Sequence, residues 1–227
     1  MDPGLYEAVA SGDEATFENF SRDTVLSTET REKNSVLHVA VVGKQLGMVK
    51  KILHQLQSDH QYRPLLHRQN SDGDTPLHLA SRLGCLEIVA VILNHHRKNI
   101  ESTTNYYEDD VLTRFWKQLV DREGSSFSSP PKEITSMANL EMDTALHVAV
   151  KSGCLSVVEL LIHEDAKLAL LTNGAGESPL FLAVERKCFD IARCLVDSAE
   201  EYSLAGRDGM NALHVAVVYS QQGRLST

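Results

Sequence analysis

Histidine and cysteine are the residues of this chain best suited to bind a metal ion, and the 227 residues include ten histidines and four cysteines. Four of the histidines, His38, His78, His147 and His214, follow a leucine inside near-identical short segments. Equivalent side chains on stacked helices lie roughly 8–10 Å apart, whereas the ligands of one zinc ion lie about 2 Å from it. We therefore predict a ladder of structural histidines, each bonded to backbone in the loop beneath it, and no metal site.

The repeat spacing also keeps the cysteines apart. Cys85, Cys154 and Cys188 recur at one position, near the start of a later helix, at a spacing beyond the ~7 Å Cα separation that a disulfide tolerates. With Cys194, and without an apolar signal segment at the amino terminus, they are expected to be free thiols that pack as small buried hydrophobic side chains. No nucleophile elbow, P-loop or metalloprotease motif is present, so no catalytic residue and no cofactor is predicted.

The charge and the hydrophobic content of the chain indicate which kinds of partner it binds. Lys and Arg number 22 and Asp and Glu 31, which gives a formal charge of −9 and argues against nucleic acid as the main partner. The chain is 42% hydrophobic and 23% charged, which is enough apolar content for a core. It has no run of 18 apolar residues that could span a bilayer. We expect a cytoplasmic protein, with a location at the cytosolic face of a membrane as an alternative.

Internal repetition predicts the fold. Five segments align without gaps: SVLHVAV from Ser35, TPLHLAS from Thr75, TALHVAV from Thr144, SPLFLAV from Ser178 and NALHVAV from Asn211. Their first residues are strong helix N-caps, and in two copies proline follows at the first helical position. The pairs at 72–73, 173–174 and 208–209 are Asp-Gly or Asn-Gly, which suit turns that need a positive φ.

A second apolar stripe at helical spacing follows each of the first four segments. Paired helices repeated about every 33 residues form an α-solenoid. The segment DGDTPLHLASRLGCLEIVAVIL, residues 72–93, resembles an ankyrin repeat. The resemblance implies an all-α ankyrin-repeat solenoid of helix-turn-helix units with β-turn tips and one irregular insertion. NLEMDTALHVAV, residues 139–150, also resembles plant ankyrin proteins of the accelerated-cell-death type, which implies defence signalling and a membrane-spanning part that these 227 residues do not contain.

The predicted organisation has four parts. Residues 1–33 form an amino-terminal capping repeat and linker, and residues 34–93 form ankyrin repeats. Residues 94–140 form an irregular helical extension, with an amphipathic helix at 109–120 and a serine- and proline-rich loop at 124–132. Residues 141–227 form further repeats, the last one incomplete.

By resemblance, such a stack binds proteins through its tips and the concave face of its first helices. The residues predicted to bind a partner are Ser71, Asp72, Asp74, Arg82, Leu83, Glu141, Asp143, Lys151, Ser152, Glu177, Glu185, Arg186, Asp208 and Met210. We expect Arg82 and Lys151 to anchor an acidic or polar partner segment, so that reversing both charges abolishes binding without lowering thermal stability.

The predicted function is a monomeric, non-catalytic module for a protein partner, with no nucleic acid bound. The alternative is the cytosolic regulatory half of a membrane-anchored ankyrin protein, and an enzyme is a distant third.

Overall fold

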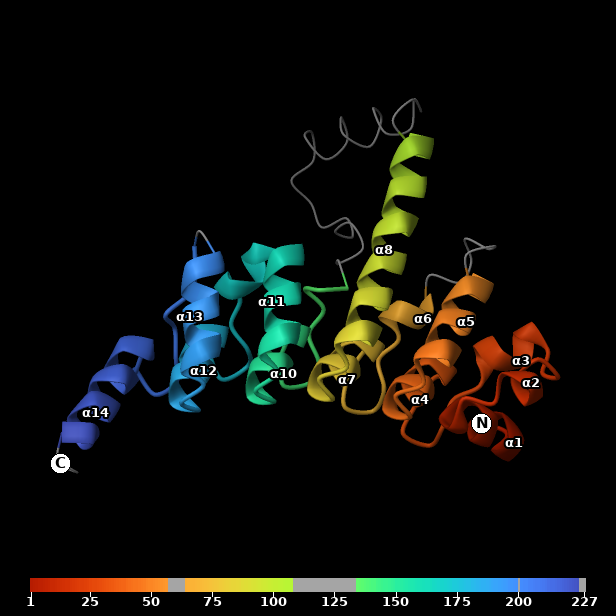
Figure 1. The fold of residues 1–227 in the computed structure, drawn as a ribbon, viewed down its shortest axis with the longest axis horizontal. Coiled ribbons are helices and arrows are strands. Elements are labelled where there is room, and N and C mark those ends of the chain that lie inside the picture. Colours follow the sequence, from red (N-terminus) through yellow and green to blue (C-terminus); the bar gives the residue numbers. More distant parts are fainter. Residues whose placement is uncertain (57–63, 108–133, 200, 225–227) are drawn as a thin grey trace, which may run out of the picture.

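The structure, a computed structural model, describes residues 1–56, 64–107, 134–199 and 201–224. Its helices stack side by side into an elongated array with the two termini at opposite ends (Figure 1). Three short helices begin the array: α1 (Pro3–Ser11), α2 (Glu14–Phe17) and α3 (Arg22–Ser27). Fold class and repeat architecture are therefore as the sequence predicts.

The helices after residue 34 form two rows (Figure 1). The first row holds the helices that begin each repeat: α4 (Val36–Val42), α7 (Pro76–Arg82), α10 (Ala145–Lys151), α12 (Pro179–Glu185) and α14 (Ala212–Arg224). The second row holds α5 (Leu46–Leu56), α8 (Leu86–Tyr107), α11 (Leu155–Glu164) and α13 (Phe189–Ser198). A short helix α6 (Pro64–His67) and a 3₁₀ helix η2 (Ala166–Leu170) precede two of the tips.

The predicted caps explain why each first-row helix starts where it does. The side-chain oxygens of Thr75, Ser178 and Asn211 accept bonds from the backbone N–H three residues later, at 3.4, 3.1 and 3.0 Å. Each bond satisfies one donor that the helix geometry leaves without a partner. The repeated leucine and alanine of α4, α7, α10 and α12 are buried between neighbouring layers, which fixes the stacking distance.

Each tip is a tight turn with a left-handed residue two positions before the cap, and in the fifth tip the preceding Asp208 is left-handed as well. Lys33, Gly73, Met142, Gly176 and Gly209 occupy this position, with φ between 59° and 76°. In the fourth unit the positive φ therefore falls at Gly176 and not in the predicted Asn173-Gly174 pair. Gly174 is needed for a different reason, because a Cβ there would lie 2.9 Å from the backbone oxygen of Glu141.

Helix α8 has 22 residues and extends beyond its neighbours α5 and α11 (Figure 1). The sequence from 86 to 107 contains no glycine or proline to end it. The start of the predicted 94–140 extension is thus a continuation of this helix. The amphipathic helix expected at 109–120 and the loop at 124–132 lie outside the described residues.

Among the described residues no element packs on the far side of helix α14, and several of its apolar side chains are exposed. Leu213 is 59% exposed, whereas the equivalent leucines Leu37, Leu77 and Leu146 are fully buried. In the described part of the chain, no helix is both long and apolar enough to cross a bilayer.

Candidate protein-interaction surface

An asparagine organises the tip of three successive units. The Oδ1 of Asn70, Asn139 and Asn173 accepts bonds from the backbone N–H groups two and four residues later, at 3.0–3.1 Å. These bonds close each tip in the way that asparagine side chains stabilise turns. The position of the tip is therefore fixed by a buried or half-buried side chain, before any partner binds.

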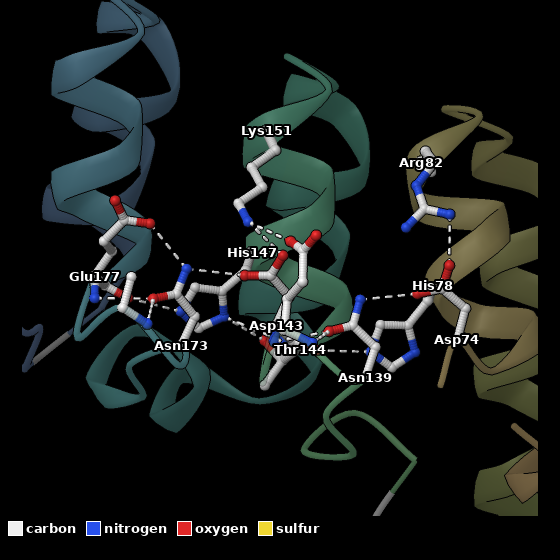
Figure 2. Close-up of polar contacts among 12 residues, drawn as sticks. Asp74, His78, Arg82, Asn139, Asp143, Thr144, His147, Lys151, Asn173 and Glu177 are labelled. Carbon is white, nitrogen blue, oxygen red and sulfur yellow. Dashed lines mark hydrogen bonds and ion pairs between the residues drawn. The ribbon is translucent and has the colours of Figure 1, made fainter. Parts of the chain in front are cut away.

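The same asparagines connect each unit to the one before it. Nδ2 of Asn139 donates to Oδ1 of Asp74 at 2.9 Å, and Nδ2 of Asn173 donates to Oδ1 of Asp143 at 3.0 Å (Figure 2). Between the first and second units, Nδ2 of Asn70 donates to Oδ1 of Asn34 at 3.1 Å. Backbone bonds between tips run alongside, such as Leu140 N to Asp72 O at 3.1 Å. We call this row of side chains the polar ladder.

The carboxylates of the polar ladder are buried, and cations on the first-row helices neutralise them. Asp74 lies 2.5 Å from Arg82, and Asp143 lies 2.5 Å from Lys151 (Figure 2). In both pairs the base follows the acid by eight residues, at the end of the short helix. Burial lowers the pKa of Lys151, but its bonds to Asp143 and Glu141 outweigh this, so the net effect is a raised pKa.

In the fourth unit, the base that neutralises the buried acid comes from a different position. Glu177 takes the place of the buried aspartate, but the position eight residues later is also acidic, Glu185. Arg207, from the next tip, donates to Glu177 at 2.8 Å and also to Glu185. Each buried acid of the polar ladder is thus matched by a base of this chain.

The histidine ladder is confirmed for three of its four members. Nε2 of His38, His78 and His147 bonds the backbone oxygen of Asp74, Asp143 and Glu177, respectively, at 3.0–3.2 Å. Nδ1 of each ring accepts the backbone N–H of its own cap, so the rings are neutral with the proton on Nε2. Burial is the main reason that the pKa of each of these histidines is lowered.

The fourth member, His214, is exposed, and in the described part of the chain its ring bonds only its own cap, Asn211. In the fourth unit, Phe181 replaces the histidine and packs where an asparagine would stand. A Cβ added to Gly206, which aligns with Asn173, would lie 2.2 Å from the Phe181 ring. Within the described residues no group of three or more His, Cys, Asp or Glu side chains is placed to hold a metal ion.

The four cysteines are free thiols, as predicted, but they are half-buried rather than buried. Cys85, Cys154 and Cys188 direct Sγ toward the backbone oxygen two residues earlier, at the short turn between the two rows. This turn leaves one side of the side chain open. Burial, and then the nearby Cys85, raise the pKa of the Cys154 thiol, which makes it a poor nucleophile.

The predicted partner-binding residues divide into three groups. Nine are exposed: Ser71, Asp72, Arg82, Leu83, Glu141, Ser152, Arg186, Asp208 and Met210. Lys151 and Glu185 are half-buried. Asp74, Asp143 and Glu177 are buried, and their carboxylates turn inward onto the polar ladder, so they do not lie on the outer surface where the predicted contact with a partner would place them.

The predicted role of Arg82 and Lys151 needs the same correction. Each already binds a buried carboxylate of this chain, so neither presents an unpaired positive charge to a partner. Reversing either charge would leave a buried aspartate beside a new carboxylate. The expectation that stability is unaffected by reversal therefore does not agree with the structure.

Sequence reasoning missed two features of this surface. The asparagines of the polar ladder share a position five residues before the cap in three units, and aligning the segments further toward the amino terminus would have found them. Leu140 and Met142 were missed because a tip was expected to be polar. They are 75% and 55% exposed and flank Glu141 on the third tip.

Comparison with known proteins agrees with this geometry. The sequence profile of the family described as "Ankyrin repeats (3 copies)" matches residues 5–104 and 146–225. The crystal structure of the ankyrin repeat domain of Bcl-3 superposes with a TM-score of 0.69, covering 97% of this chain and 82% of that chain at 20% identity. At that identity the likeness concerns the fold.

Curated relatives are distant and longer. The Nuclear factor NF-kappa-B p105 subunit of Gallus gallus is 25% identical over 81% of this chain and 19% of its own length. The B-cell lymphoma 3 protein homolog of Mus musculus is 27% identical over 86% and 44%. Protein ACCELERATED CELL DEATH 6 of Arabidopsis thaliana is 22% identical over 88% and 27%. The chain thus spans less than half the length of these relatives, and the profile match over most of its residues shows that it belongs to the ankyrin repeat family.

Proposed function

We propose that this chain is a monomeric, non-catalytic module that binds a partner protein along its tips and the exposed positions of its first-row helices. The observation that carries the proposal is the polar ladder. Hydrogen bonds and ion pairs from unit to unit fix the tips relative to one another, so the exposed residues between them form a preorganised surface. A rigid surface loses little conformational entropy on binding.

The side chains that face outward are chemically varied, as protein recognition requires. They include polar Ser71 and Ser152, acidic Asp72, basic Arg186 and apolar Leu83. A mixed surface of this kind, extended over several units, suits a folded domain or an extended peptide better than a small molecule, which binds in a concave pocket.

Photo-crosslinking tests this proposal. A benzoylphenylalanine at Ser71 or at Ser152 should form a covalent adduct with a discrete partner in extracts of the source cells. The matched control is Glu159, exposed on the second-row helix α11, where the same probe should give none of that adduct. Adducts of equal yield from Glu159, or no adduct from any tip or first-row position, would overturn the proposal.

A second candidate rests on the likeness to Protein ACCELERATED CELL DEATH 6 over 88% of this chain. On that basis we propose a role in plant defence signalling, in the cytoplasm, as the regulatory half of a protein anchored at a membrane. Fractionation of the source tissue, with an antibody to residues of this chain, tests the location. Recovery only in the supernatant of a high-speed spin would count against membrane anchoring and leave the binding module intact.

A further inference from the structure

The third tip differs from the other tips in presenting two large apolar side chains. Leu140, at 75%, is the most exposed large hydrophobic residue among those described, and Met142 on the same turn is 55% exposed. The equivalent residues of the flanking tips are small or polar: Ser71 and Gly73 before, Gly174 and Gly176 after. The apolar character is therefore a property of this tip alone among these three.

Glycines on both sides let the neighbouring tips pack closely against these two residues. A Cβ at Gly73 would be 3.1 Å from Cγ of Leu140, and one at Gly174 would be 3.6 Å from Cβ of Met142. Leu140 thus lies against the second tip and Met142 against the fourth. Together they form an apolar ridge across the middle of the tip row.

Met142 occupies its position at a conformational cost. It has φ +60°, at the left-handed position that glycine fills at the second, fourth and fifth tips. A side chain there is disfavoured relative to glycine, by roughly 1 kcal/mol. Packing inside this chain does not offset that cost, because the side chain is mostly exposed.

Negative charge surrounds the ridge. Asp72 is exposed, and within the described residues no cation pairs with it. Glu141 lies between the two apolar residues and shares Lys151 with the buried Asp143, so these three groups keep one uncompensated negative charge. A partner that covers the ridge should therefore bring positive charge beside its apolar group.

Taking the proposed binding function as given, we propose that Leu140 and Met142 are the anchor of the interface and that their partner is a protein segment with an aliphatic or aromatic side chain next to Lys or Arg. The apolar group lies on the ridge between the second and fourth tips. The basic group lies near Asp72 and Glu141. A few residues near the centre of an interface, desolvated when the partner binds, carry most of the binding energy.

Selection from a phage-displayed library of random dodecapeptides, with the 227-residue chain as bait, tests this. Enriched peptides should combine an apolar residue with a neighbouring Lys or Arg and lose at least about tenfold in affinity on the L140S and M142G variants. Asp72→Asn should weaken binding less and flatten its dependence on salt. L170S is the matched control, since Leu170 is an exposed leucine (41%) away from the tips.

The M142G variant separates binding from folding, because glycine relieves the left-handed strain and should leave the midpoint of unfolding unchanged or raised. The proposal would be overturned if the enriched peptides were acidic, or if they bound L140S and M142G as tightly as the parent chain. A selection that enriches no peptide would overturn it as well. Crosslinking of a partner from Ser71 or Ser152 that is unaffected by L140S and M142G would overturn the anchor and leave the binding module standing.

Discussion

Asn139 and Asp74 are 65 residues apart in the sequence, yet Nδ2 of Asn139 donates to Oδ1 of Asp74 over 2.9 Å, and both side chains are buried. The enlarged connection between the second and third units, residues 94–138, thus leaves the contact between them chemically the same as that between the third and fourth units. The insertion departs from the stack at α8 and the chain returns in register at the third tip.

Asn139→Ala tests how much this contact stabilises the fold. The change removes two bonds to backbone N–H groups and one to a buried carboxylate, so we expect a loss of about 3 kcal/mol in the free energy of unfolding. Urea unfolding followed by circular dichroism measures it. Ser71→Ala, at an exposed residue of the neighbouring tip, should stay within about 0.5 kcal/mol of the parent chain. Equal losses in both variants would show that the polar ladder contributes little.

Charge reversal at the first-row helices should lower stability. Arg82→Glu or Lys151→Glu places a carboxylate next to a buried aspartate, and we expect a cost of about 2 kcal/mol for each, since the basic side chains are partly exposed. Thermal unfolding of the two variants provides the measurement. Arg193→Glu, exposed on α13, makes the same change of charge at a side chain that forms no ion pair with the described residues, and it should leave the midpoint almost unchanged. If the midpoint of thermal unfolding were unaltered in all three variants, Arg82 and Lys151 would again be candidates to bind a negatively charged group of a partner.

Gly206 should tolerate no side chain, although it lies in a loop. A Cβ there would meet the ring of the fully buried Phe181 at 2.2 Å, and we expect Gly206→Ala to cost about 2 kcal/mol. The F181L/G206A double variant should lose less than the two single changes together, because the smaller side chain removes the overlap. Gly47→Ala on α5 is the control, since its Cβ would meet only the end of the exposed Glu14 side chain. Strict additivity of the two single changes would contradict this packing.

The repeats could be predicted from the sequence because their features are local. A cap, a leucine and an alanine at fixed spacing define each first-row helix whatever surrounds it, and Thr75 to Ala80 show all three. The direction in which a tip carboxylate points depends on neighbouring units, so Asp74 looked like a surface acid until Asn139 and Arg82 were seen around it. The ridge was missed for a related reason: Leu140 resembles a core residue by type, and only the tip geometry shows that nothing in the described chain covers it.

The histidine ladder predicts how stability depends on pH. His38, His78 and His147 have a lowered pKa in the folded state, with burial as the main cause, from an ordinary value of 6.5. Well above pH 6.5 both states are neutral at these sites, and the full stability is present. As the pH falls below 6.5 the unfolded chain binds protons that the folded chain does not, so the free energy of unfolding decreases. With three sites the slope can reach about 4 kcal/mol per pH unit, and it levels off only below the folded-state pKa values.

Urea unfolding at a series of pH values from 8 to 5.5 measures this slope. Protonation adds a hydrogen to Nδ1, which accepts the cap N–H in each repeat, so the loss should begin in the layers that contain these histidines. His163→Gln, at an exposed position of α11, should leave the profile unchanged, because that side chain is exposed in both states. A flat profile across this range, or stability that increases on acidification, would mean that the three rings are not held neutral in the folded chain.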